Sequence, residues 1–250
     1  MNTSENTILI TGGSADIGLE LAKQLAEAGN KVIITGRNAA RLQQAAEKIK
    51  GLTTIQSDVA NEDDVANLAA RLTKDFPSLN IVINNAGNAA LYDLATVEGA
   101  AQKSREEFAV NYFAITDLNE KLLPLLKEHT NAAIVNVSSI VAFAPNSTIP
   151  SYSASKAALH SYTLSLRYAL RNTSVKVFEL MPPLVNTDFS QGIGGHKGIP
   201  ASQVATEFLT AWKDDVYEIH VGNTADFYKL SLASPADAFN MLNKEEAVTA

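Results

Sequence analysis

The sequence contains no cysteine. This absence excludes a disulfide framework, a thiol nucleophile and a metal site with cysteine ligands, and we predict no metal site of any kind. The chain also has no stretch approaching 18 uninterrupted apolar residues, so we expect no transmembrane helix. Its first residues lack both a positively charged region and a long apolar run, which argues against a signal peptide. Together these absences favour a cytoplasmic protein.

Positive charge is also scarce. Lys and Arg number 20 against 27 Asp and Glu, which gives a formal net charge of −7. Nucleic-acid-binding domains usually carry a basic face, so we predict no nucleic-acid partner. The composition, 46% hydrophobic and 19% charged, is typical of a globular protein. A chain of 250 residues suits one α/β unit, and we expect residues 1–250 to form a single domain.

Short apolar runs alternate with segments of helical periodicity along most of the chain. Apolar strands separated by helices predict a parallel sheet covered on both faces. Right-handed crossovers then predict a single-domain α/β Rossmann fold, a doubly wound parallel sheet of about seven strands. The predicted strands are 6–13, 31–37, 53–59, 80–87, 132–139, 175–182 and 217–222. The predicted helices are 17–28, 40–50, 61–76, 105–128, 152–171 and 201–212, and the fourth is expected to bend or end near Pro124.

The loop after the first strand reads "TGGSADIG", residues 11–18. It lies at the carboxyl edge of the sheet, where the free amides of a helix N-terminus suit a phosphate. The spacing from Gly12 to Gly18 is not the six-residue dinucleotide-binding fingerprint. Taken alone, the loop is therefore also compatible with an ordinary strand-to-helix turn.

The same loop resembles the T-G-x-x-x-G-x-G segment of the short-chain dehydrogenases/reductases. Asp16 stands where that pattern has its middle glycine. Aspartate tolerates left-handed backbone geometry and can cap a helix. We therefore expect its carboxylate to cap the helix or to face solvent. The resemblance implies that the pyrophosphate of a nicotinamide cofactor contacts the residues Gly12, Ser14, Asp16, Ile17 and Gly18.

Three later segments resemble further parts of this family's cofactor site, although each alone is also an ordinary loop. They are "SDV" at 57–59, "NNAG" at 84–87 and "PPLVNT" at 182–187. The resemblance implies that Asp58 accepts from the adenine amino group, that Val185 binds the carboxamide and that Thr187 touches the phosphate. Pro183 replaces the family's glycine there. The other cofactor-binding residues implied by these segments are Val59, Asn85, Ala86, Gly87 and Pro182.

Tyr152 and Lys156 lie one helical turn apart, on one face of a predicted helix. Such pairs also occur by chance on surfaces. Ser139 ends the fifth strand 13 residues before Tyr152, and the set resembles the family's Ser…Tyr-x-x-x-Lys catalytic residues. This spacing favours Ser139 over its neighbour Ser138. Asn111 matches the family's fourth catalytic position.

The resemblance also implies the role of each catalytic residue. Tyr152 is the acid or base, and the Lys156 ammonium is expected to lower its pKa from about 10. Lys156 also reaches the nicotinamide ribose, so Tyr152 and Lys156 count among the cofactor-binding residues as well. Ser139 orients the substrate oxygen. Asn111 holds a water beside Lys156.

The end of the second strand bears on the choice of cofactor. An acidic residue there favours NAD, because it binds the 2′-hydroxyl of the ribose. In this chain Gly36 occupies the position and Arg37 follows it. A guanidinium can pair with a 2′-phosphate, so we predict NADP(H), the alternative being a merely solvated arginine.

The substrate region is predicted from less distinctive features. Residues 188–213 are expected to form a substrate loop or lid, with hinge motion at Gly192, Gly194 and Gly195. Nearby apolar residues suggest an uncharged small-molecule substrate. These are Leu91, Tyr92, Phe143 and Ile149. His196 is interpreted as a solvated loop residue rather than a substrate contact, and His160 as lying off the catalytic site.

The last part of the chain resembles the DltE-like branch of the family. The family usually forms dimers or tetramers, so a homodimer or homotetramer is expected. Tyr162, Leu166 and Leu170 are candidates for such an interface, or simply for the core.

The combined prediction is an NADP(H)-dependent oxidoreductase that interconverts a carbonyl compound and a secondary alcohol by hydride transfer. Two alternatives stay open. One is a redox sensor that binds NADP without catalysis, and the other is an epimerase or dehydratase on the same scaffold.

Overall fold

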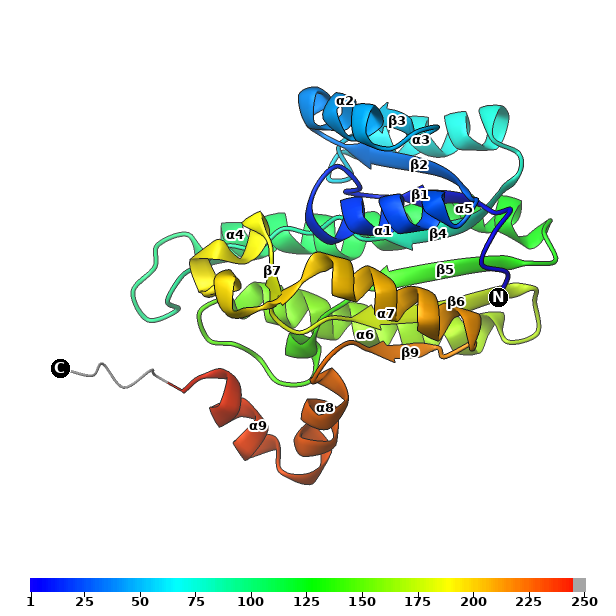
Figure 1. Cartoon of the computed structure of the whole chain (residues 1–250). Helices are drawn as coiled ribbons and strands as arrows, with labels where there is room; N and C mark the ends of the chain where they lie inside the picture. The colour runs from blue at the N-terminus through cyan, green and yellow to red at the C-terminus, as the bar shows by residue number, and fades with distance from the viewer. Residues whose placement is uncertain (245–250) are drawn as a thin grey trace.

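In the computed structural model, which describes residues 1–244, a parallel sheet of seven strands forms the centre of the molecule (Figure 1). Its strand order is β3-β2-β1-β4-β5-β6-β9, and every neighbouring pair is parallel. The strands are β1 (Thr7–Ile10), β2 (Lys31–Gly36), β3 (Thr53–Gln56), β4 (Leu79–Asn84), β5 (Ala132–Val137), β6 (Val175–Met181) and β9 (Glu218–His220). The predicted α/β fold is confirmed, strand by strand.

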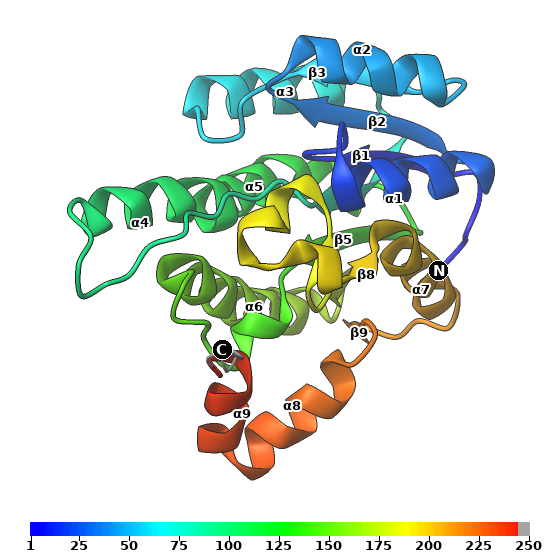
Figure 2. The same ribbon diagram turned by 60° about the vertical axis from the view of Figure 1, so that its left-hand side comes forward.

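Helices cover both faces of this sheet (Figure 2). Because successive strand residues point to opposite faces, Ile8 and Ile10 join one apolar cluster while Leu9 joins another. The helices on the first face are α1 (Asp16–Glu27), α2 (Ala39–Lys48) and α7 (Ala201–Lys213). Those on the second are α3 (Glu62–Asp75), α5 (Ala114–Lys127) and α6 (Pro150–Leu170). The sheet thus lies between two apolar layers.

The chain reverses its direction of travel across the sheet between β1 and β4, which are neighbours in space. Open α/β sheets bind ligands at such a switch point, at the carboxyl ends of the strands. Here the two strand ends are joined through Thr11. Its hydroxyl accepts hydrogen bonds from the amides of Asn85 and Ala86, at 3.0 and 3.1 Å. The side-chain amide of Asn85 in turn donates to the carbonyls of Thr11 and Gly12.

The helix predicted for residues 105–128 differs from the observed one. It begins earlier, as α4 (Ala100–Phe108), continues through a π-helical turn (Ala109–Phe113) and ends as α5. Pro124 lies inside α5 and does not end it. Proline removes only one backbone donor, and the buried side chains of α5 on both sides of Pro124 hold the helix against the sheet.

Two short helices near the C-terminal end are absent from the prediction. They are α8 (Thr224–Ala233) and α9 (Pro235–Leu242), and they pair below the sheet, as Figures 1 and 2 show. Phe227 and Ala238 pack with Ile140, Val141 and neighbouring residues in a third, smaller apolar cluster. A separate two-stranded ribbon pairs β7 (Val185–Asn186) with β8 (Ile199–Pro200).

Of the candidate interface residues, Leu170 is buried in the core, whereas Tyr162 and Leu166 are partly buried. Leu170 is buried in the apolar layer on the α5 side, and Leu166 packs against that layer. Tyr162 is partly buried and its hydroxyl accepts from Asn119 at 3.3 Å. Within residues 1–244, no helix combines the length and apolarity needed to cross a bilayer.

At the amino edge of the sheet, buried asparagines replace apolar packing. Asn80 accepts from the amide of Thr7 at 2.9 Å, and its amide donates to Asn6 at 2.9 Å and to the carbonyl of Asn131 at 2.7 Å. Asn80→Ala leaves these buried groups with fewer partners. We expect a loss of about 1–3 kcal/mol in the free energy of unfolding, measured by urea denaturation.

Asn67→Ala is the control, because Asn67 is an exposed residue of α3. It should change the free energy of unfolding by no more than about 0.5 kcal/mol. Equal stabilities for the two variants would show that the asparagine network contributes nothing.

Candidate active site

A cavity of about 1480 Å³ runs along the carboxyl edge of the sheet. It exceeds the roughly 300–1,000 Å³ of a typical small-molecule pocket, so it has room for a dinucleotide and a substrate together. Nearly all of the site residues predicted from the sequence line it. They are Gly12, Ser14, Asp16, Ile17, Gly18, Arg37, Asp58, Val59, Asn85, Ala86, Gly87, Ser139, Tyr152, Lys156, Pro182, Val185 and Thr187. Asn111 is the exception.

The glycines of the first loop are required by close packing. Gly12 has a φ of +65°, which favours glycine. A Cβ atom on Gly13 would lie 2.5 Å from the side chain of Ile34, and one on Gly18 would lie 2.4 Å from the carbonyl oxygen of Gly12. The loop therefore turns tightly into α1, whose N-terminal end lies at the cavity.

Asp16 departs from one of its two predicted roles. Its φ of 52° is left-handed, as the tolerance of aspartate for this geometry anticipates. The capping prediction is wrong, because Ala15 is the N-cap of α1 and no side chain caps the helix. The Asp16 carboxylate instead accepts from the amide of Asp188 at 3.2 Å. This bond joins the glycine loop to the segment that follows β7.

At the outer end of the cavity, two arginines lie near Gly36. Arg37 and Arg41 both line the cavity, and a Cβ atom on Gly36 would lie 3.1 Å from the hydroxyl oxygen of Ser14. An acidic side chain at position 36 would therefore be crowded. The sequence analysis missed Arg41, which lies in the first turn of α2, just after Arg37.

Two buried hydroxyls at the same end have no hydrogen-bond partner among the described residues. They belong to Thr35 and Ser57, and both residues line the cavity. Buried polar atoms are normally paired, so these hydroxyls are suited to meet a bound polar molecule. Asp58 lies beside them and accepts from the amide of Ala60 at 3.0 Å.

At the inner end, Ser139, Tyr152 and Lys156 converge. Ser139 follows β5, and its side chain is hydrogen-bonded to Tyr152. Lys156 donates from Nζ to the carbonyl of Val137 at 2.8 Å and lies 5.5 Å from the centre of the Tyr152 ring. Ser138 is directed elsewhere, because its hydroxyl donates to Glu179. The preference for Ser139 over Ser138 thus agrees with the geometry.

Burial dominates the electrostatics of this group. It raises the pKa of Tyr152, an effect that the hydrogen bond from Ser139 reduces and the charge of Glu107 increases. The net shift is upward and not downward as expected from Lys156, because desolvation of the phenolate is the largest effect on this pKa. Burial also lowers the pKa of Lys156 to about 8, while the Glu179 carboxylate acts in the opposite direction.

Asn111 lies in the π-helical turn and is fully buried. Its side chain binds both backbone groups of Asn88, at 2.8 Å each, and donates to the hydroxyl of Ser155 at 2.9 Å. It therefore ties the loop after β4 to α6 beside Lys156. Its role in holding a water stays a prediction.

Glu107 was missed by the sequence analysis, because a charged residue in a helix is normally solvated. It is fully buried and accepts from the amide of Ala90 at 2.7 Å and from the hydroxyl of Ser151. The hydroxyl of Tyr92 pairs with Ser151 at 2.5 Å. These contacts fasten the segment after β4 to the start of α6.

The substrate end of the cavity is apolar, but two of its four predicted residues lie elsewhere. Leu91 and Ile149 line it. Tyr92 is engaged with Ser151, and Phe143 packs on Tyr228 and His160, so neither lines the cavity. Additional lining residues come from the lid segment and from the end of α9. They are Phe189, Ile193, Met241 and Leu242.

The lid segment itself is more ordered than its glycines suggest. Residues Asp188–Ile193 form a 3₁₀ helix that ends at Gly194, whose φ is 80°. His196 does not line the cavity, in agreement with its interpretation as a loop residue, whereas Lys197 does. The C-terminal residues Met241 and Leu242 were missed because no catalytic or cofactor-binding motif of the family falls on them.

Comparisons with known proteins agree with this geometry. A model of the short chain dehydrogenase family matches residues 6–197. The chain is 38% identical to the uncharacterized oxidoreductase DltE of Bacillus subtilis, across 98% of this chain and 100% of that protein. It is 28% identical to an uncharacterized oxidoreductase of Staphylococcus epidermidis, across 83% of this chain and 90% of the relative.

Solved structures show the same architecture. A short chain dehydrogenase from Burkholderia cenocepacia, crystallised with NADP, is 25% identical and superimposes with a TM-score of 0.85, covering 98% of this chain and 100% of the other. A short chain dehydrogenase/reductase from Burkholderia phymatum, crystallised with NAD, is 20% identical with a TM-score of 0.87, and the match covers 100% of both chains. The protein is therefore an oxidoreductase that belongs to the short-chain dehydrogenase/reductase family.

Proposed function

We propose that this protein is an NADP(H)-dependent oxidoreductase that interconverts a carbonyl compound and a secondary alcohol. The observation that carries the proposal is the convergence of Ser139, Tyr152 and Lys156 at one end of a cavity large enough for a dinucleotide. The cofactor, when bound, donates or accepts a hydride.

The residues present fit such a cofactor. The first-turn amides of α1 suit the pyrophosphate, and the unpartnered hydroxyls of Thr35 and Ser57 offer polar contacts at the adenosine end. Arg37 and Arg41 supply two guanidinium groups for a 2′-phosphate. The crowding at Gly36 disfavours the acidic side chain that would select NAD. These features support NADP(H) over NAD(H).

Tyr152 is the proton donor in carbonyl reduction. Reduction places a proton on the substrate oxygen, and the raised pKa of Tyr152 keeps its phenol in the protonated form that a donor needs. The Lys156 ammonium, 5.5 Å from the ring centre, favours the negative charge that remains on the phenol oxygen after donation. Ser139, hydrogen-bonded to Tyr152, orients the substrate oxygen toward it.

The substrate is a small molecule with an uncharged, apolar part. Aliphatic and aromatic side chains line the cavity from the loop after β4, the start of α6, the lid and α9, beside polar ones such as Asn146 and Thr148. The apolar ones include Leu91, Ile149, Phe189, Ile193 and Met241. The preferred substrate can be found with a panel of ketones that differ in chain length, each mixed with NADPH. The rate at which NADPH absorbance falls ranks the ketones.

The same panel separates the alternatives. A redox sensor has no need for Ser139, Tyr152 and Lys156 in contact, so their arrangement favours an enzyme. Tight NADPH binding without turnover of any ketone would favour the sensor. Product formation with no net change in NADPH would favour an epimerase or dehydratase on this scaffold.

Tyr152→Phe removes the proposed proton donor and little else. We expect kcat to fall at least about 100-fold, because proton transfer to the substrate oxygen is lost, while the NADPH dissociation constant stays within about 3-fold. Steady-state kinetics and NADPH fluorescence titration measure the two quantities. Tyr92→Phe is the matched control, since the Tyr92 hydroxyl pairs with Ser151 outside the cavity. Similar kcat values for both variants would contradict the assignment.

Arg37→Asp tests the choice of cofactor. Loss of a charge-assisted contact and repulsion of the 2′-phosphate should lower the ratio of kcat/KM for NADPH to that for NADH by about 10- to 100-fold. Arg71→Asp makes the same charge change on α3, where Arg71 pairs with Asp75 at 3.6 Å, and should leave the ratio unchanged. An unchanged ratio in Arg37→Asp would remove the support for NADP(H).

The pH dependence follows from Lys156. Its pKa of about 8 means that the ammonium is present below that pH and is lost as the pH rises through it. Tyr152, with a raised pKa, keeps its proton over the same range. We therefore expect kcat/KM for carbonyl reduction to fall above about pH 8, in a profile measured from pH 6 to 10. A profile that stays flat to pH 10 would contradict the role of Lys156.

A further inference from the structure

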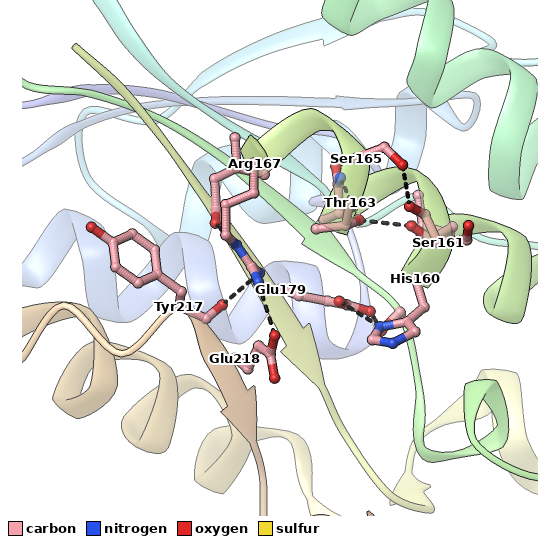
Figure 3. Close-up of polar contacts among 12 residues, drawn as sticks. His160, Ser161, Thr163, Ser165, Arg167, Glu179, Tyr217 and Glu218 are labelled. Carbon is pink, nitrogen blue, oxygen red and sulfur yellow. Dashed lines mark hydrogen bonds and ion pairs between the residues drawn. The ribbon is translucent and has the colours of Figure 1, made fainter. Parts of the chain in front are cut away.

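A buried carboxylate lies directly behind the reaction residues. Glu179 belongs to β6 and is fully buried. Its Oε1 accepts from the hydroxyl of Ser138 at 2.5 Å, and its Oε2 lies 2.9 Å from Nδ1 of His160. Figure 3 shows His160 of α6 and Glu179 of β6 pointing toward one another. The proposed reaction leaves both residues without a role.

A fully buried carboxylate is costly unless a cation or several donors face it. Arg167, one candidate cation on α6, is already engaged. It lies farther along the helix than His160 and donates to Glu218 at 2.9 Å and to the carbonyl of Tyr217 (Figure 3). It also donates to the carbonyl of Val177 in β6. His160 is a cation only while protonated. Glu179 is thus not neutralised by a permanent direct partner.

Lys156 is the lysine of α6 whose charge Glu179 influences. Lys156 and His160 lie one helical turn apart on the face that packs on β5 and β6. Lys156 donates to the carbonyl of Val137, and Ser138, the next residue, donates to Glu179. The ammonium and the carboxylate therefore contact adjacent residues at the end of β5, immediately before Ser139.

We propose that Glu179 is a positioning residue of the reaction site, and that His160 sets the charge that Glu179 presents to Lys156. The buried carboxylate favours the ammonium form of Lys156 and, through Ser138, holds the strand end that carries Ser139. This inference rests on the proposed function, because it assigns a purpose to the charge of Lys156.

The charges around the pair support this assignment. Glu179 is the charged group that raises the pKa of Lys156 against the effect of burial. The hydrogen bond to Glu179 raises the pKa of His160, with Glu218 adding to it and burial and Arg167 opposing it. His220 of β9 also interacts with His160, and Phe143 packs against the His160 ring.

The direction of the pH effect follows. While His160 is protonated, its imidazolium offsets the charge of Glu179 at 2.9 Å. Once His160 has lost its proton, the carboxylate acts on Lys156 without that offset. Glu179 therefore supports the ammonium of Lys156 most strongly when His160 is neutral.

Glu179→Gln keeps the shape of the side chain and removes its charge. We expect the alkaline fall of kcat/KM, and of NADPH affinity measured by fluorescence, to move about one pH unit lower. The change should appear in kcat more than in KM. Glu179→Asp retains the charge and should recover part of the shift. Glu218→Gln is the matched control, because Glu218 pairs with Arg167 near the surface and should leave the profile in place.

His160 offers a second, independent test at a partly exposed position. His160→Lys carries a permanent positive charge, so it should move the alkaline fall in the same direction as Glu179→Gln. His160→Gln stays neutral, so it should not move the alkaline fall to lower pH. If Glu179→Gln proves unfolded by circular dichroism, this pair of variants decides the question.

The His160 titration, followed by NMR without cofactor or substrate, separates this inference from the proposed function. Its midpoint should drop in Glu179→Gln. A protein that turns over no ketone but shows this drop and the shifted NADPH profile would overturn the function and keep the inference. Equal profiles for wild type and Glu179→Gln, equal shifts in Glu179→Gln and Glu218→Gln, or coincident profiles for His160→Lys and His160→Gln would overturn the inference.

Discussion

The hydrogen bonds of Thr11 are the constraint on which the site depends. Its hydroxyl holds the amides of Asn85 and Ala86, and Asn85 returns two bonds to the backbone of Thr11 and Gly12. These contacts join the ends of β1 and β4, where the order of strands reverses. The cavity floor is formed at that junction. Because the glycine loop is held there, the N-terminus of α1 points into the cavity and not into solvent.

One face of α6 organises the chemistry at the other end. Tyr152, Lys156 and His160 follow at intervals of one turn, so a single helix places Lys156 at the end of β5 and His160 at β6, with Tyr152 one turn before them. The dense packing that positions them also removes water. Desolvation is therefore the largest influence on both Tyr152 and Lys156, and it raises one pKa and lowers the other. Two buried carboxylates modify these values. Glu107 raises the pKa of Tyr152 further, and Glu179 raises the pKa of Lys156 against the effect of burial.

Much of the fold could be predicted because its signals are local. Each strand is a short apolar run, and Gly29, close after the end of α1, has a positive φ, which favours glycine. The helix over 105–128 was predicted less well, since it contains a π-helical turn at 109–113, in which Asn111 is buried, and a buried charged residue, Glu107, just before that turn. The pair α8–α9 escaped prediction because it is short and is held by contacts with distant residues such as Ile140.

The sequence by itself determined the alternation of strands and helices, the glycine loop and the spacing of Ser139, Tyr152 and Lys156, because these depend on neighbours within a few residues. Tertiary structure alone decided the rest. Asp16 binds the amide of Asp188, 172 residues away, instead of capping its own helix. The pKa of Tyr152 rises because elements from across the chain exclude water around it. Glu179 meets His160 only when β6 packs under α6. Desolvation and long-range pairing depend on the assembled fold, which no local pattern contains.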